Sequence, residues 1–176
     1  MNNLMSLFEN QYETPPPYIS REQLHPLLRQ ISRLKYDSEA ILEVVDRFFS
    51  RYRLNPVDFR SIRQDYSRTI LLKEESGFEI MMARWDRGAI TPIHGHPYYT
   101  FMYVIEGQLK EELFVKEEGR LLKISDLNLT PGCYSYHKGE RHRFDNAIHR
   151  ITSEKNSLSL HIYSDDALKG EKYRAA

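Results

Sequence analysis

The sequence predicts a mainly β protein in which N-terminal helices precede an antiparallel β-sandwich or barrel. Short runs of β-branched and aromatic residues recur after residue 68, and turn residues such as Gly77, Gly88, Gly107 and Gly132 lie between them. Before residue 56, by contrast, apolar residues recur at helical spacing. The 176 residues suit one domain, 1–176, in which 1–58 forms an extended segment plus packing helices.

The helical part begins after a proline-rich lead-in. Residues 1–19 include Pro15–Pro17, which favour an extended chain. Ser20–Gln23 has the pattern of a capping box and predicts a helix from there to about Leu34. Asp37 or Ser38 can cap a second helix, which we expect to close at Asn55-Pro56. The apolar stripes are Leu24, Leu27, Leu28 and Ile31 in the first helix, and Ile41, Val44, Val45, Phe48 and Phe49 in the second.

The β-rich part follows the helices. Its runs alternate with turn residues and contain no internal repeat, which is typical of an antiparallel sandwich or barrel. We expect strands at Thr69–Leu72, Phe78–Trp85, Thr100–Ile105, Leu109–Val115, Leu121–Ile124 and Leu158–Tyr163.

Charge and cysteine content limit the class of partner. Lysine plus arginine and aspartate plus glutamate number 25 each, without a basic cluster, so a nucleic-acid or anionic-membrane surface is not indicated. Cys133 is the only cysteine, which excludes an intrachain disulfide and fits a reducing compartment. No apolar span or signal peptide is evident, and together with the single cysteine this leads us to expect a cytoplasmic protein. We also expect a monomer, and the charge balance points to a small molecule as its partner.

His94-Gly95-His96 indicates a metal site. On a strand, side chains two residues apart point to the same face, so both imidazoles can bind one ion. A third ligand is available in Gly139–Asn146, which contains His142. His149 competes with His142, because each precedes an arginine, but the glycine before and the asparagine after favour His142.

These two segments resemble the two halves of the cupin motif, Gly-x5-His-x-His…Gly and Gly-x2-His-x3-Asn. The resemblance implies a cupin, jelly-roll-like β-barrel in which His94, His96 and His142 converge on the interior. The cupin pattern usually has a glutamate four or five residues after the second histidine, but Thr100 and Phe101 stand there. Three neutral imidazoles leave a divalent ion with its full charge, which favours an anionic ligand such as a thiolate.

A polar face on the last strand points to a substrate. Ser159, His161 and Tyr163 alternate with three apolar residues and therefore share one face. This face is either solvent-exposed or a hydrogen-bonded relay that lines a polar cavity.

Six blocks between residues 55 and 165 together look like the cysteine dioxygenase family of thiol dioxygenases. They are Tyr66–Arg68, Trp85, Pro92–His96, Gly107–Phe114, His142–Asn146 and Ser159–Tyr163. The resemblance implies that His94, His96 and His142 bind Fe(II) and that Arg68 pairs with a substrate carboxylate, with Tyr66 beside it. It implies that Ser159, His161 and Tyr163 form a catalytic relay, and that Trp85 is a framework residue.

The resemblance therefore implies a cysteine dioxygenase, an enzyme of cysteine catabolism that oxidises L-cysteine with O2 to cysteine sulfinic acid. Some family members cross-link a cysteine to the tyrosine; Thr100 occupies that position here, so no thioether is expected. The alternatives are a dioxygenase for another small thiol, such as 3-mercaptopropionate, a zinc or manganese cupin of another reaction class, and a non-catalytic sensor. Arg68 argues against 3-mercaptopropionate, because that subgroup tends to have glutamine there.

Overall fold

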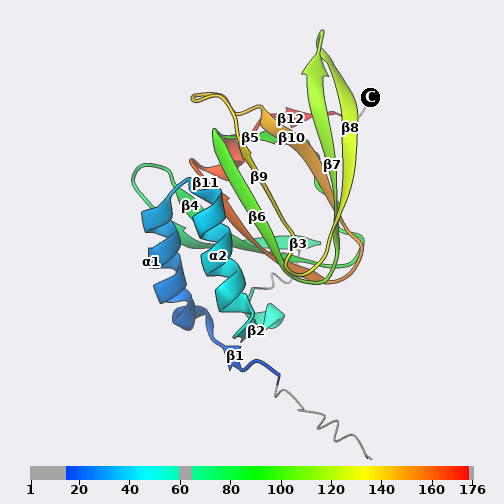
Figure 1. Cartoon of the computed structure of the whole chain (residues 1–176). Coiled ribbons are helices and arrows are strands. Elements are labelled where there is room, and N and C mark those ends of the chain that lie inside the picture. The colour runs from blue at the N-terminus through cyan, green and yellow to red at the C-terminus, as the bar shows by residue number, and fades with distance from the viewer. Residues whose placement is uncertain (1–14, 60–64, 175–176) are drawn as a thin grey trace, which may run out of the picture.

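Two five-stranded sheets and a helical hairpin make up the computed structural model, which describes residues 15–59 and 65–174 (Figure 1). One sheet has the order β3-β4-β11-β6-β9 and is backed by the helices; we call it the helix-backed sheet. The other has the order β12-β5-β10-β7-β8 and is called the histidine sheet. The strands of these sheets are β3 (Tyr66–Lys73), β4 (Glu79–Trp85), β5 (Ile93–His96), β6 (Tyr99–Glu106), β7 (Leu109–Glu117), β8 (Arg120–Leu129), β9 (Tyr134–Lys138), β10 (Asn146–Ser153), β11 (Ser157–Tyr163) and β12 (Lys172–Tyr173).

The mainly β prediction is confirmed, but the sheets do not close into a barrel. All strand pairs within the two sheets are antiparallel. No pairing joins the sheets at their edges, β3 and β9 in one and β12 and β8 in the other, among the described residues. The fold is therefore an open two-sheet sandwich rather than the predicted barrel.

The helical hairpin differs from the prediction at its ends. The chain enters through a short strand, β1 (Tyr18–Ile19), which pairs in parallel with β2 (Arg53–Leu54), so the helices are not the first elements. The Ser20 amide donates to Gln23 Oε1 at 2.8 Å, but the first turn is a 3-10 helix, η1 (Arg21–Leu24), and α1 spans His25–Leu34. Asp37 caps α2 (Ser38–Phe49), which ends six residues before Asn55. The other 3-10 turns are η2 (Pro56–Phe59) and η3 (Ala167–Lys169). The part of the predicted lead-in that covers residues 1–14 lies outside the described residues.

Two apolar cores hold these layers together. The larger one lies between the helices and the helix-backed sheet, where Leu27 and Ile41 meet Leu160 and Ile162. A smaller one lies between the two sheets and includes Trp85, Val104 and Ile151. Because successive strand residues face opposite sides, Leu158, Leu160 and Ile162 serve the first core and leave Ser159, His161 and Tyr163 facing the histidine sheet.

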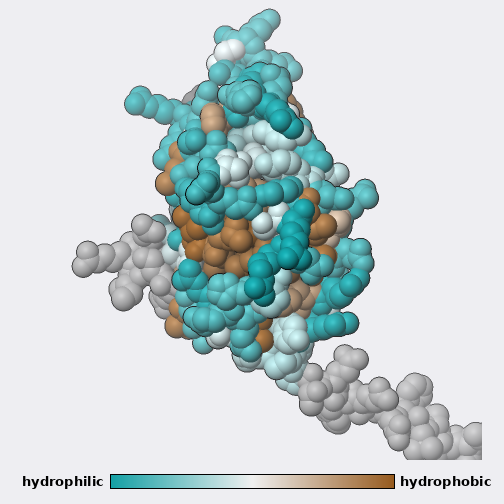
Figure 2. Space-filling view, turned by 90° about the vertical axis from the view of Figure 1, so that its left-hand side faces the viewer, coloured by the Kyte–Doolittle hydropathy of each residue, from teal (hydrophilic) through white to brown (hydrophobic). Residues whose placement is uncertain are grey.

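The helical side of the molecule carries apolar surface. Figure 2 views that side and shows apolar side chains across its middle, with hydrophilic residues above and below. Pro26, Leu27, Val44 and Phe48 line a shallow groove between α1 and α2. Neither α1 nor α2 has the length and apolar character that a membrane-spanning helix needs, and this holds for every helix among residues 15–59 and 65–174.

Candidate active site

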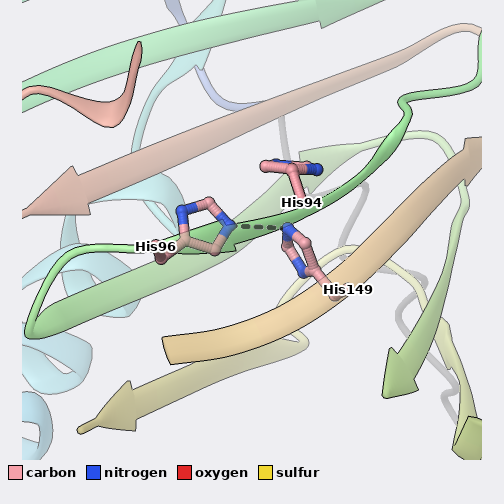
Figure 3. Close-up of side chains that lie close together, drawn as sticks. All are labelled: His94, His96 and His149. Carbon is pink, nitrogen blue, oxygen red and sulfur yellow. Dashed lines mark hydrogen bonds between the residues drawn. The ribbon is translucent and has the colours of Figure 1, made fainter. Parts of the chain in front are cut away.

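Three imidazoles meet between the sheets. His94 and His96 lie on β5, and His149 lies on the neighbouring strand β10, directly opposite His94 in the register. One ring nitrogen of each residue lies within 4.8 Å of the others (Figure 3). His96 Nε2 and His149 Nε2 are 2.7 Å apart. The structure thus brings together two of the three predicted metal ligands and adds His149.

His142 is not part of this cluster, and its prediction as the third ligand is corrected. The residue is exposed, precedes β10 and has a positive φ of 65°. His149 takes its place because β10 pairs with β5 and sets His149 across from His94.

The residues of the Gly139–Asn146 pattern stabilise a loop and do not form part of the histidine cluster. The Asn146 side chain holds the loop: Oδ1 accepts from the Glu140 amide at 2.8 Å, and Nδ2 donates to the carbonyl of Arg143 at 3.1 Å. A Cβ on Gly139 would lie 2.1 Å from Asn146 Oδ1, so any other residue there would displace the Asn146 side chain. The spacing that resembled a metal motif therefore reflects a loop closed by an asparagine.

Backbone and carboxylate acceptors orient two of the three rings. His94 Nδ1 lies 2.9 Å from the Pro92 carbonyl, and His149 Nδ1 lies 2.6 Å from Glu111 Oε1. A carbonyl and a carboxylate only accept, so both Nδ1 atoms carry the proton and both Nε2 atoms present a lone pair to the cluster. His96 Nε2 then donates to His149 Nε2, and His96 Nδ1 is buried without a hydrogen-bond partner among the described residues.

Burial keeps His94 and His96 neutral. Desolvation, with His149 nearby, lowers the pKa of His94 to about 3, and the same causes hold the pKa of His96 well below its usual range. Neutral imidazoles are the form that binds metal, and three nitrogen donors suit iron, zinc or manganese. The donor set therefore fits a divalent metal ion.

A hydrogen-bonded chain runs along β11 beside the histidines. Trp85 Nε1 donates to Ser159 Oγ at 2.8 Å, Ser159 Oγ lies 2.8 Å from His161 Nε2, and His161 Nδ1 lies 3.0 Å from Tyr163 Oη. His161 Nε2 is the only acceptor that the described residues offer the Ser159 hydroxyl. A neutral His161 then donates from Nδ1 to Tyr163, which leaves the Tyr163 hydroxyl proton free for a partner in the cavity. The face of β11 is thus a buried relay and not a solvated one.

Burial sets the protonation of this relay. Desolvation raises the pKa of Tyr163 well above its usual range, so the phenol keeps its proton at neutral pH. Desolvation, and then the charges of His149 and Arg68, lower the pKa of His161 to about 3. The relay therefore consists of neutral groups.

The low pKa of His161 predicts an acid-sensitive fold. The unfolded chain takes up this proton near pH 6.5, but the folded protein does not until about pH 3, so the stability contributed by neutral His161 is complete above pH 6.5 and is lost as pH falls. Between pH 7 and pH 5 this costs about 2 kcal/mol. In urea titrations at both pH values, wild type should lose about 2 kcal/mol more unfolding free energy than His161→Gln. Equal losses would contradict the prediction.

The relay and the histidines share a cavity of about 100 Å³. Arg68 and Lys172 line it, and no aspartate or glutamate does so among the described residues. Arg68 makes no ion pair with any residue of that part of the chain, so its charge is available to an anionic substrate. Tyr66 stacks on Trp85, with ring centroids 5.0 Å apart and planes inclined by 19°, and so shapes the same wall. The cavity favours a small anion.

Thr100, and not Cys133, is the neighbour of Tyr163 in the sheet. Thr100 is buried and pairs directly with Tyr163 across β6 and β11. Cys133 lies in the turn between β8 and β9, with Sγ 3.5 Å from Thr130 Oγ1. The expectation that no thioether forms to Tyr163 stays a prediction, and the register places a threonine, not the cysteine, beside Tyr163.

Three residues of the site had weak signals in the sequence. The sequence offers His149 only as the weaker candidate beside His142, because no strand is predicted around His149. Trp85 is a core residue, as predicted for a framework position, and its indole N–H also donates to the relay. Glu111 contacts His149 from β7, and only the register of β7 against β10 could have indicated it.

The family model and the curated relatives that match this chain carry the same family description. A family model described as Cysteine dioxygenase type I matches residues 14–173. The relatives named cysteine dioxygenase type 1 from Rattus norvegicus and Homo sapiens are each 26% identical over 151 residues, which cover 80% of this chain and 74% of theirs. The Danio rerio protein is 25% identical over 154 residues, which cover 81% and 75%. Among solved structures, a cupin superfamily protein from Desulfitobacterium hafniense is 14% identical with a TM-score of 0.46, over 65% of this chain and 92% of that one.

Proposed function

Because this chain belongs to the cysteine dioxygenase type I family, we propose that it is a thiol dioxygenase that converts L-cysteine and O2 into cysteine sulfinic acid. Both oxygen atoms enter the product: R–SH + O2 gives R–SO2H, with sulfur oxidised by four electrons and O2 reduced by four. The observation that carries the proposal is that three imidazoles, the Tyr163 hydroxyl and the Arg68 guanidinium line one small cavity.

His94, His96 and His149 would hold Fe(II). The donor set fits because His94 and His96 are neutral, and because the rings of His94 and His149 are fixed with Nε2 toward the cluster. Fe(II) held there would supply the one-electron chemistry that O2 needs to react with a thiolate. The neutral ligand set leaves the substrate thiolate to provide negative charge, which supports a thiol substrate.

The other residues of the cavity would bind the substrate and manage its protons. Arg68 would donate two parallel hydrogen bonds to the substrate carboxylate. Tyr66 would support that end of the pocket through its stacking on Trp85. The Tyr163 hydroxyl, oriented by His161 and Ser159, would donate to oxygen as negative charge develops there.

The test is sulfinate formation by iron-loaded protein supplied with L-cysteine under O2, measured together with O2 uptake. We expect one sulfinate for each O2 consumed. A higher kcat/KM with 3-mercaptopropionate than with L-cysteine would overturn the cysteine assignment while leaving a thiol dioxygenase. Metal binding without O2 uptake on any small thiol would overturn the dioxygenase assignment itself.

Arg68→Ala is expected to weaken substrate binding. A charge-assisted hydrogen-bond pair contributes about 1.5–3 kcal/mol, so KM for L-cysteine should rise about 10- to 100-fold. The matched control is Arg87→Ala, an exposed arginine in the turn after β4, whose KM should not change. Steady-state kinetics at saturating O2 measure both. An unchanged KM for Arg68→Ala would remove its assigned role.

A further inference from the structure

Glu111 is a buried carboxylate that contacts the metal cluster only through another residue. It lies on β7, is 3% exposed, and its Oε1 accepts from His149 Nδ1 at 2.6 Å. Its other oxygen, Oε2, is buried and has no hydrogen-bond partner among the described residues. We propose that Glu111 is the positioning residue of the metal centre: it fixes the tautomer and the direction of His149 and places a carboxylate behind the three imidazoles.

The register of β7 explains how the chain achieves this contact. His149 pairs with Leu113 across β10 and β7, so Glu111 lies one side-chain step along the same face. Glu112, its neighbour, points to the opposite face, where Arg150 and Lys123 bind its carboxylate. Glu111 therefore contacts the histidine cluster, whereas its neighbour Glu112 forms ion pairs on the other face of the sheet.

His149 needs such a restraint because it has space on both sides. Its ring lines the active-site cavity and also a second cavity of about 770 Å³, which lies between β9 and the β7–β8 hairpin. Glu111 lines this second cavity. A ring with open volume behind it can turn away from the cluster, and the 2.6 Å bond to Glu111 opposes that rotation.

Fold stability does not account for Glu111. Burying a carboxylate with one unsatisfied oxygen destabilises the folded state, and an apolar side chain of similar size removes that cost. A ligand histidine, by contrast, gains basicity and a fixed tautomer when a carboxylate accepts its second N–H. Glu111 also supplies charge that the cupin pattern usually places near position 100, where this chain has Thr100. It does so through His149 rather than as a direct ligand.

The inference rests on the proposed metal centre, and Co(II) can test it without turnover. Apparent Kd for Co(II) would be measured by anaerobic competition with a chelator, together with the visible absorption of bound Co(II), in wild type, Glu111→Gln, Glu111→Leu and Glu112→Gln. We expect the Kd to rise about 10- to 100-fold in Glu111→Leu, with an altered spectrum. Glu111→Gln, which keeps an acceptor but not the charge, should show a smaller rise, and Glu112→Gln should match wild type.

Unfolding temperatures of the chelator-treated proteins separate positioning from packing. A lower unfolding temperature in Glu111→Leu with wild-type Kd and spectrum would overturn the proposal, because Glu111 would then be structural. If Glu111→Leu fails to fold, the isosteric Glu111→Gln decides: an unchanged Kd and spectrum overturn the proposal, and a raised Kd supports it. Failure of wild type to bind Co(II) would instead refute the metal centre on which the proposed function depends.

Discussion

His149→Ala should abolish metal binding and activity, whereas His142→Ala should leave both near the wild-type level. His149 would supply one of three nitrogen donors, so its loss should reduce metal affinity by more than the 10- to 100-fold that a supporting residue costs. His142 is exposed and lies outside the cluster. Metal content after loading with Fe(II) and desalting, with sulfinate formation on the same samples, measures the difference.

The His149→Ala and His142→Ala variants together also test which histidine is the third metal ligand. If His142→Ala lost its iron and His149→Ala retained it, the register of β10 against β5 would be wrong in solution. Folding must be checked for both variants by circular dichroism, because His149 is buried and its replacement leaves a cavity.

Tyr163→Phe should lower kcat about 100-fold and change KM little. The substitution removes one preorganised hydroxyl donor, and the loss of such a donor typically costs 10²–10³ in kcat. Ser159→Ala should have a smaller effect, because Ser159 acts on Tyr163 only through His161. Steady-state kinetics with L-cysteine at saturating O2 measure both variants.

Tyr136→Phe is the matched control, since this tyrosine is half exposed on β9 and lines the second cavity rather than the first. Its kcat should equal that of wild type. A Tyr163→Phe enzyme with kcat within threefold of wild type would show that its hydroxyl does not contribute to the reaction, and the relay would then be a packing feature.

Much of this fold can be predicted from signals that act between residues close together in the sequence. Strands with strong β-formers, such as Phe78–Trp85 and Leu158–Tyr163, are predicted within one residue, and both helices are predicted by their apolar stripes, although α2 ends six residues before Asn55. The alternation along β11 separates its polar residues from its core residues, but it does not decide between a solvated face and a buried relay. Asp37, one of the two cap residues that the sequence offers, caps α2, because this signal acts over three residues.

The third histidine depended on information that is not local. β10 carries positive φ at Ala147 and a shift of register between Asn146 and His149, so its sequence does not alternate cleanly. Its pairing with β5 is set by residues about 50 positions away. The motif around His142 was the stronger pattern, but Asn146 and Gly139 serve the loop. Closure of the barrel could not be judged either, because it depends on how edge strands meet.

β11 has a consequence for the tolerance of this chain to mutation. All seven of its residues are buried, with the relay on one face and the helix-packing residues on the other. Neither face has solvent into which a larger or more polar side chain could turn, and a shift of one residue would exchange the two sets. In a saturation library, β11 should therefore accept the fewest substitutions of any strand, and variants in α1 or α2 that loosen the packing of Leu160 should reduce activity before they unfold the protein.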